Sequence, residues 1–67
     1  MGNEPEEFID STGIPEKRVS SGEIYCYNNG TEFGWSDTTC INGYKYVCTG
    51  NSFVGKWQLV SPKTKCS

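Results

Sequence analysis

Four cysteines are the residues of this chain whose type and spacing most directly imply chemistry, either disulfide formation or zinc binding. They are Cys26, Cys40, Cys48 and Cys66, and the sequence contains no histidine. Zinc sites usually draw their ligands in pairs a few residues apart, because two ligands on one tight turn hold the metal together. No two of these cysteines lie that close, so we predict two disulfides, and we expect neither a metal nor another cofactor.

Two disulfides in so short a chain predict a secreted protein, located in an extracellular or periplasmic compartment. Chains of this length rarely gain enough stability from a hydrophobic core alone, so covalent cross-links are a common supplement. The first ten residues, MGNEPEEFID, lack the basic and apolar stretches of a signal peptide, and we expect that a leader has been removed. No stretch approaches the length of a transmembrane helix, so we expect no membrane span.

The N-terminal third of the chain differs in composition from the remainder. Residues 1–23 are acidic and residues 24–67 are slightly basic, and neither part has the basic surface expected for nucleic-acid binding. No hydrophobic period of 2 or 3.6 runs through the first 22 residues. We predict an extended or disordered acidic arm over residues 1–22 and a folded domain over residues 23–67. If the arm docks, its anchors are Phe8, Ile9 and Ile14.

From residue 23 onward, segments typical of β-strands alternate with glycine-containing turns. Asn-Gly occurs at 29–30 and again at 42–43, and this dipeptide is typical of two-residue hairpin turns because both residues tolerate a positive φ. Consecutive hairpins usually pair with their neighbours. We predict an all-β fold, a small disulfide-rich antiparallel meander of about five short strands. The expected strands are 23–28, 31–35, 38–41, 44–49 and 56–60.

The second Asn-Gly hairpin limits how the cysteines can pair. A two-residue turn sets Cys40 opposite Lys45, and because side chains alternate along a strand, Cys48 then points to the other face. A Cys40–Cys48 bond would have to cross the sheet, which disulfide geometry disfavours. Two pairings remain open: Cys26–Cys40 with Cys48–Cys66, or Cys26–Cys48 with Cys40–Cys66. We favour the second, which ties the first hairpin to the central strand and the C-terminal tail to the third strand.

Aromatic side chains are the most informative candidates for a binding surface. Eight of the nine lie between Tyr25 and Trp57, and a sheet this small leaves one face largely exposed. We expect Tyr46 and Trp57 in the core. Tyrosine and tryptophan are frequent anchors of binding surfaces, because each joins an apolar body to a polar tip. The expected partner-binding candidates are Tyr25, Tyr27, Trp35 and Phe53.

No arrangement of residues in the sequence predicts catalysis. A serine or threonine nucleophile needs an adjacent base, and the chain has no histidine to supply one. Glu32 and Asp37 resemble the carboxylate pair of a glycosidase only in residue type, and we interpret them as surface acids of a hairpin and a turn. Asn29 begins an N-x-T glycosylation sequon, which matters only in a eukaryotic source. We therefore predict that the protein is not an enzyme.

The segments CYNNGTEF, GW and YKYVCTGNSFVGKW resemble small extracellular cysteine-rich modules of the von Willebrand factor type C and fibronectin type I kind. They also resemble short bacterial secreted domains of unknown function. Both named families usually place two cysteines one residue apart in the central strand, whereas this chain has only Cys48 there, followed by Thr49 and Gly50. The resemblance implies a small β module that binds something, and it transfers no binding site.

The function predicted from these features is that of a non-enzymatic secreted binding module. It contacts a protein partner through an aromatic sheet face or a free edge strand, and a carbohydrate stacked on the aromatic face is a variant of the same idea. One alternative is a small secreted toxin or enzyme inhibitor that acts through the loop of residues 50–55. Another is a structural component of an assembly that adds edge strands to its neighbours.

Overall fold

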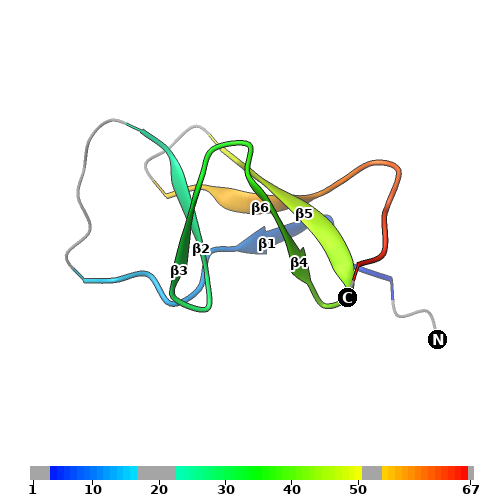
Figure 1. The fold of residues 1–67 in the computed structure, drawn as a ribbon, viewed down its shortest axis with the longest axis horizontal. Helices are drawn as coiled ribbons and strands as arrows, with labels where there is room; N and C mark the ends of the chain where they lie inside the picture. The colour runs from blue at the N-terminus through cyan, green and yellow to red at the C-terminus, as the bar shows by residue number, and fades with distance from the viewer. Residues whose placement is uncertain (1–3, 17–22, 51–53, 67) are drawn as a thin grey trace.

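The computed structural model describes residues 4–16, 23–50 and 54–66, and these residues form six β-strands and no helix (Figure 1). The all-β class and the short strands are confirmed, with one strand more than the sequence predicted. The strands are β1 (Phe8–Asp10), β2 (Tyr25–Asn28), β3 (Thr31–Gly34), β4 (Thr38–Ile41), β5 (Tyr44–Thr49) and β6 (Lys56–Leu59).

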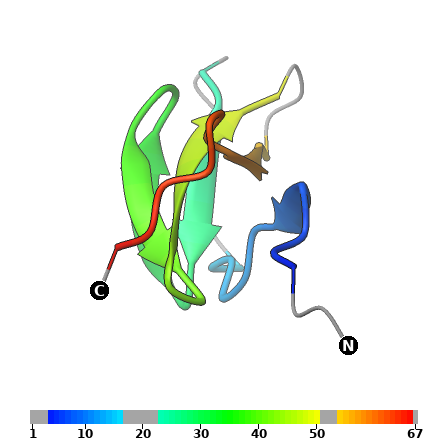
Figure 2. The same ribbon diagram turned by 90° about the vertical axis from the view of Figure 1, so that its right-hand side faces the viewer.

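The strands form two antiparallel sheets rather than one continuous meander. Strands β4, β5 and β6 pair in sequence order as predicted, and β1 adds to the far side of β6, which gives the order β1-β6-β5-β4. Strands β2 and β3 form a separate two-stranded sheet. Figure 2 shows β1 and β4 at opposite ends of the curled four-stranded sheet.

Both Asn-Gly turns have the backbone conformation that their sequence predicts. The φ angles are 54° and 88° at Asn29–Gly30 and 53° and 85° at Asn42–Gly43. Positive values at both central residues are the requirement of the type I′ hairpin turn. The second turn sets Cys40 opposite Lys45, which is the register that the sequence analysis used to assign faces.

The arm contributes the sixth strand, which the sequence analysis did not predict. Ile9 of β1 lies opposite Trp57 of β6, and the N–H of Leu59 donates to the carbonyl of Glu7 at 2.8 Å. Of the three expected anchors, only Ile9 packs against the core, since Phe8 and Ile14 are exposed. A strand of three residues is too short to produce a detectable alternation, so backbone pairing rather than sequence pattern places it.

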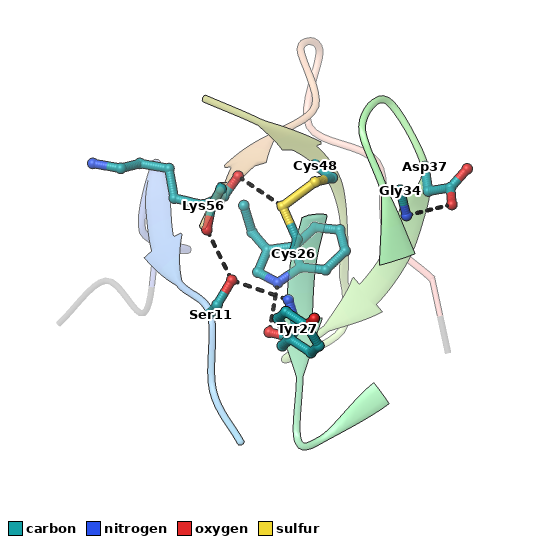
Figure 3. The surroundings of a disulfide bond; sticks show 9 residues. Ser11, Cys26, Tyr27, Gly34, Asp37, Cys48 and Lys56 are labelled. Carbon is teal, nitrogen blue, oxygen red and sulfur yellow. Dashed lines mark hydrogen bonds between the residues drawn. A yellow bond between two sulfur atoms is a disulfide. The ribbon is translucent and has the colours of Figure 1, made fainter. Parts of the chain in front are cut away.

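The residues after β1 connect the arm to the β2–β3 sheet. The hydroxyl of Ser11 donates to the carbonyl of Gly55 at 2.8 Å and accepts from the N–H of Tyr27 at 3.0 Å (Figure 3). The N–H of Thr12 donates to the carbonyl of Tyr27, and the carbonyl of Thr12 accepts from the N–H of Gly30. Residues 7–12 of the arm thus bond to both sheets, to β6 through β1 and to β2 through Ser11 and Thr12.

The core lies between the two sheets and is dominated by two aromatic rings and one disulfide. Tyr46 and Trp57 are fully buried, as predicted, and Phe33 of β3 packs edge-on against Trp57 with ring centroids 5.2 Å apart. The Cys26–Cys48 disulfide lies in the same cluster and joins the hairpin to the central strand β5.

The two disulfides are Cys26–Cys48 and Cys40–Cys66, the favoured one of the two pairings that the face argument left open. They lie on opposite faces of the four-stranded sheet, because Cys48 shares its face with Tyr46 whereas Cys40 is paired with Lys45 on the other. The second disulfide fixes the C-terminal tail, whose backbone also pairs with the start of β5. Two disulfides in a domain of this size fit an oxidising compartment.

Candidate functional site

The most exposed aromatic side chain of the described residues lies on the turn that connects β3 to β4. In this turn, residues 34–37, the N–H of Asp37 donates to the carbonyl of Gly34 at 3.1 Å. The third residue, Ser36, has a φ of 72°, as a type II turn requires. The carboxylate of Asp37 in turn accepts from the N–H of Gly34 at 2.9 Å (Figure 3). The turn is therefore closed by reciprocal hydrogen bonds between its two ends.

The turn is also fixed to the buried centre of the molecule through a β-bulge. The N–H of Ser36 donates to the carbonyl of Cys48 at 2.9 Å, and the N–H of Cys48 donates to the carbonyl of Asp37 at 2.8 Å. Ser36 and Asp37 thus lie opposite the single residue Cys48, and Ser36, the first of the two, has a positive φ. This is the pattern of a G1 bulge. Because Cys48 is buried and disulfide-bonded to Cys26, these bonds fix the turn to a cross-linked residue of the core.

Trp35 occupies the second position of this turn, and 59% of its surface is exposed. The other large exposed hydrophobic residues of the described part are Phe8 at 49% and Ile14 at 40%, and both belong to the arm. Trp35 was one of the four partner-binding candidates, and of the three that lie in the described ranges it is the one that the structure exposes. A tryptophan on a backbone that is already fixed loses little entropy when it binds.

Tyr27 was predicted as a contact residue, and this prediction is wrong. Only 2% of Tyr27 is exposed, and its hydroxyl donates to the carboxylate of Glu32 at 2.8 Å. Its carbonyl accepts from the indole N–H of Trp57 at 3.2 Å. The sequence analysis assumed that one face of β2 meets solvent, whereas the arm residues Ser11 and Thr12 run along this strand and bond to Tyr27.

The two remaining aromatic candidates are not brought together with Trp35. Tyr25 is half-buried, and its backbone forms a parallel bridge with Val54 and accepts a hydrogen bond from Gly55. Phe53 lies outside the described residues, as do the two residues before it, so the predicted role of the 50–55 loop stays a prediction.

The titratable groups near the core serve structure. The hydroxyl of Tyr46 donates to the carbonyl of Glu6 in the arm at 2.7 Å. Burial raises the pKa of Tyr46, and the charges of Glu6 and Tyr44 raise that pKa further. The phenol is thus held in its protonated, hydrogen-bond-donating form. The carboxylates of Glu32 and Asp37 are each occupied by a hydrogen bond within the hairpin or the turn.

A shallow, open depression lies where the arm meets the end of β6. Its volume is about 340 Å³, and it is lined by Pro5, Glu7, Leu59, Val60, Ser61 and Lys63. Glu4 lies at 3.9 Å from Lys63 in a pair of exposed side chains, an arrangement that contributes little to stability. Within the described ranges, no three residues of the metal-ligating types lie close enough to hold an ion.

Comparisons with known proteins found no relative of this chain. No protein-family model matches the chain, and no curated protein and no solved structure does so either. The resemblance to von Willebrand factor type C and fibronectin type I modules therefore stays a prediction. Among the described residues, there is no helix with the length and apolar character needed to cross a membrane.

The sequence analysis missed the residues that fix the turn of residues 34–37 and those that fix the arm to β2. It placed a turn at Ser36 and Asp37 but assigned Asp37 no bond, and it gave Ser11 and Thr12 no role. A usable signal was present at the turn, because an aspartate side chain often accepts a hydrogen bond from a nearby backbone N–H. No comparable local signal existed for Ser11, whose partners Tyr27 and Gly55 are distant in sequence.

Proposed function

We propose that this chain is a non-enzymatic secreted binding module that contacts a protein partner through Trp35 and the turn that carries it. One observation supports this proposal above the others: a tryptophan with 59% of its surface exposed lies on a turn that four hydrogen bonds hold in place. Tryptophan is among the residues most enriched at the energetic centres of protein interfaces.

The way the turn is built favours a contact role over a packing role for Trp35. A core aromatic is surrounded by other side chains, as Trp57 is by Phe33 and the buried cluster that contains the Cys26–Cys48 disulfide. Trp35 instead has its backbone fixed and its side chain exposed, which is the arrangement expected of an interface anchor. The two disulfides are consistent with an oxidising compartment, and secretion is part of the proposal.

The proposal predicts that binding depends on Trp35 and not on exposed aromatic surface in general. The experiment is a screen of the disulfide-bonded protein against purified secreted proteins and receptor ectodomains, with a glycan array in parallel. Each protein that binds is then titrated with Trp35→Ala and with Phe8→Ala. Phe8 is a matched control, because it is also an aromatic residue and is about half exposed.

The expected result is a protein ligand whose dissociation constant rises about tenfold or more with Trp35→Ala, because interface tryptophans often contribute 2 kcal/mol or more. Phe8→Ala is expected to leave this constant within about twofold. Binding that Trp35→Ala leaves unchanged would contradict the proposal. Binding to glycans alone would contradict the protein partner and favour the carbohydrate alternative.

A further inference from the structure

Strand β4 ends the four-stranded sheet with an edge that is unpaired within the described residues. The opposite end of the sheet differs, because the chain after β1 turns onto β2 through Thr12. Strand β3 also has an outer side, but both backbone groups of Gly34 are bonded within the adjoining turn. The β4 edge therefore differs from the β1 end of the sheet and from the outer side of β3, where neighbouring residues take up backbone hydrogen bonds.

The ladder between β4 and β5 determines which backbone groups of β4 point outward. In an antiparallel pair, hydrogen-bonded residue pairs alternate with non-bonded pairs. Asp37 is bonded to Cys48, and the two-residue turn closes on Ile41 opposite Tyr44. Alternation from these ends leaves the N–H and C=O of Thr38 and Cys40 directed away from β5.

The sequence of β4 lacks the charged and proline residues by which proteins often protect an edge strand. Natural edges carry lysine, proline or an inward-pointing charge that discourages pairing with another strand. Strand β4 reads TTCI and contains none of these. In contrast, β1 carries Asp10 and β3 carries Glu32. Residues such as threonine and isoleucine are also those most compatible with strand pairing.

We propose that β4 pairs with β4 of a second copy of this chain, antiparallel and around a twofold axis at Thr39. In this register Thr38 of each copy lies opposite Cys40 of the other, and each of these pairs exchanges both of its main-chain hydrogen bonds. The two four-stranded sheets then form one continuous sheet. The interface is isologous, which is the commonest form of homodimer.

The side chains of β4 are compatible with this register. Thr39 faces Thr39 of the second copy, and threonine pairs across strands are favourable, whereas like charges placed directly opposite are not. The strand contains no charged residue, so the net charge of −2 on each copy does not concentrate at the axis. Cys40 is already bonded to Cys66, so the pairing is not covalent. An edge of four residues forms a small interface, and such interfaces give weak dimers.

Sedimentation velocity over a concentration series tests the dimer directly. The disulfide-bonded protein is measured from about 10 µM to about 1 mM, the range in which a weak interface populates both species. The expected result is an average mass that rises from that of the monomer toward that of the dimer. It does not exceed the dimer mass, because the pairing occupies the β4 edge of each copy. A monomer at every concentration contradicts the proposal, and so does growth beyond the dimer.

A pair of charge variants tests the position of the axis. Thr39→Lys and Thr39→Asp each place like charges opposite one another, and we expect each variant alone to be monomeric. Their equimolar mixture places opposite charges at the axis, and we expect the dimer to return as a heterodimer. A mixture that stays monomeric, when both variants retain the wild-type circular dichroism spectrum, contradicts the register around Thr39.

A second variant covers the case in which a charge at residue 39 prevents folding. Thr38→Pro removes one outward N–H without removing a bond to β5, because proline is tolerated on an edge strand where its N position faces solvent. We expect Thr38→Pro to raise the dissociation constant of the dimer at least tenfold. Thr38→Val keeps the N–H, and we expect it to leave this constant unchanged. Equal dimerisation of both variants overturns the proposal. These outcomes are separate from the titration of Trp35, which concerns another protein as ligand.

Discussion

At the scale of single residues, Ser36 occupies a backbone conformation that glycine adopts more readily. Its φ of 72° lies in the left-handed region, where a side chain costs free energy, and the first position of a G1 bulge is usually glycine. Ser36 nevertheless donates its backbone N–H to Cys48, so the hydrogen bonds of the turn hold it in place.

Ser36→Gly is therefore expected to stabilise the protein by roughly 0.5–1 kcal/mol, since the folded backbone fits glycine better. Ser36→Ala keeps a Cβ at the same φ and is the matched control, expected to have a free energy of unfolding close to that of the wild type. Urea unfolding at neutral pH measures both. Destabilisation by Ser36→Gly would show that the serine side chain, rather than the backbone, holds the turn.

The raised pKa of Tyr46 predicts that the free energy of unfolding depends on pH. Its raised pKa means that the folded protein keeps the phenolic proton to a higher pH than the unfolded chain does. The corresponding stability is fully present below the unfolded pKa of about 10 and is lost as the pH rises through the folded pKa. The hydrogen bond to Glu6 contributes about 1 kcal/mol where the phenol is protonated.

We expect Tyr46→Phe to be about 1 kcal/mol less stable than the wild type at neutral pH, because it lacks this hydrogen bond. Above about pH 10 the difference in free energy of unfolding between the two proteins is expected to narrow. Only the wild type has a phenol at residue 46, and it loses stability as that phenol ionises. Urea unfolding of both proteins from pH 7 to pH 11 measures the difference. A gap that stays constant up to pH 11, or that closes below pH 9, would be incompatible with this account.

At the scale of the elements, residues 4–16 of the arm are part of the folded structure, and a glycine permits their close approach to β2. Gly13 has a φ of 70°, and a Cβ there would overlap the backbone nitrogen of Gly30. The arm and the β2–β3 turn thus touch where neither has a side chain. This contact explains why the arm lies close enough for Ser11 and Thr12 to bond with β2.

Gly13→Ala is expected to displace the arm from β2 and to expose the amide of Tyr27 to hydrogen exchange. Gly43→Ala is the control, because its φ of 85° imposes a similar backbone cost while nothing lies within 4 Å of the added Cβ. Hydrogen exchange followed by mass spectrometry compares the two variants. Equal protection of the Tyr27 segment in both variants would show that the close contact does not position the arm.

The sequence predicted those elements whose signals are local. Asn29–Gly30 and Asn42–Gly43 fix their turns by backbone preference alone, and the face of Cys40 follows from the register of one hairpin. Strand β1 and the burial of Tyr27 depend on contacts between segments far apart in sequence. Single-residue patterns do not encode such contacts, so the same reasoning that identified Trp35 as exposed was wrong about Tyr27.

At the scale of the whole molecule, the two disulfides differ in how deeply they are buried. Cys26 and Cys48 are fully buried beside Trp57, whereas Cys40 and Cys66 are only partly buried. Their sequence separations, 22 and 26 residues, are similar, so each constrains the unfolded chain by about 3–4 kcal/mol. We therefore expect their contributions to the free energy of unfolding to differ through packing in the core.

Replacing Cys26 and Cys48 together by alanine is expected to abolish cooperative folding, because it removes both the cross-link and buried core atoms. Replacing Cys40 and Cys66 by alanine is expected to lower stability and to leave a folded protein with a free C-terminal tail. Near-ultraviolet circular dichroism during thermal unfolding measures both. The opposite order of stability would mean that the tail, rather than the core, holds the sheets together.

The central claim is that Trp35 serves contact and not folding, and the free energy of unfolding of Trp35→Ala tests it most directly. Because the indole is 59% exposed on a turn held by backbone and Asp37 bonds, we predict a value within about 0.5 kcal/mol of the wild type. A loss of about 3 kcal/mol or more, the usual cost of truncating a buried aromatic, would make Trp35 a core residue and contradict the account.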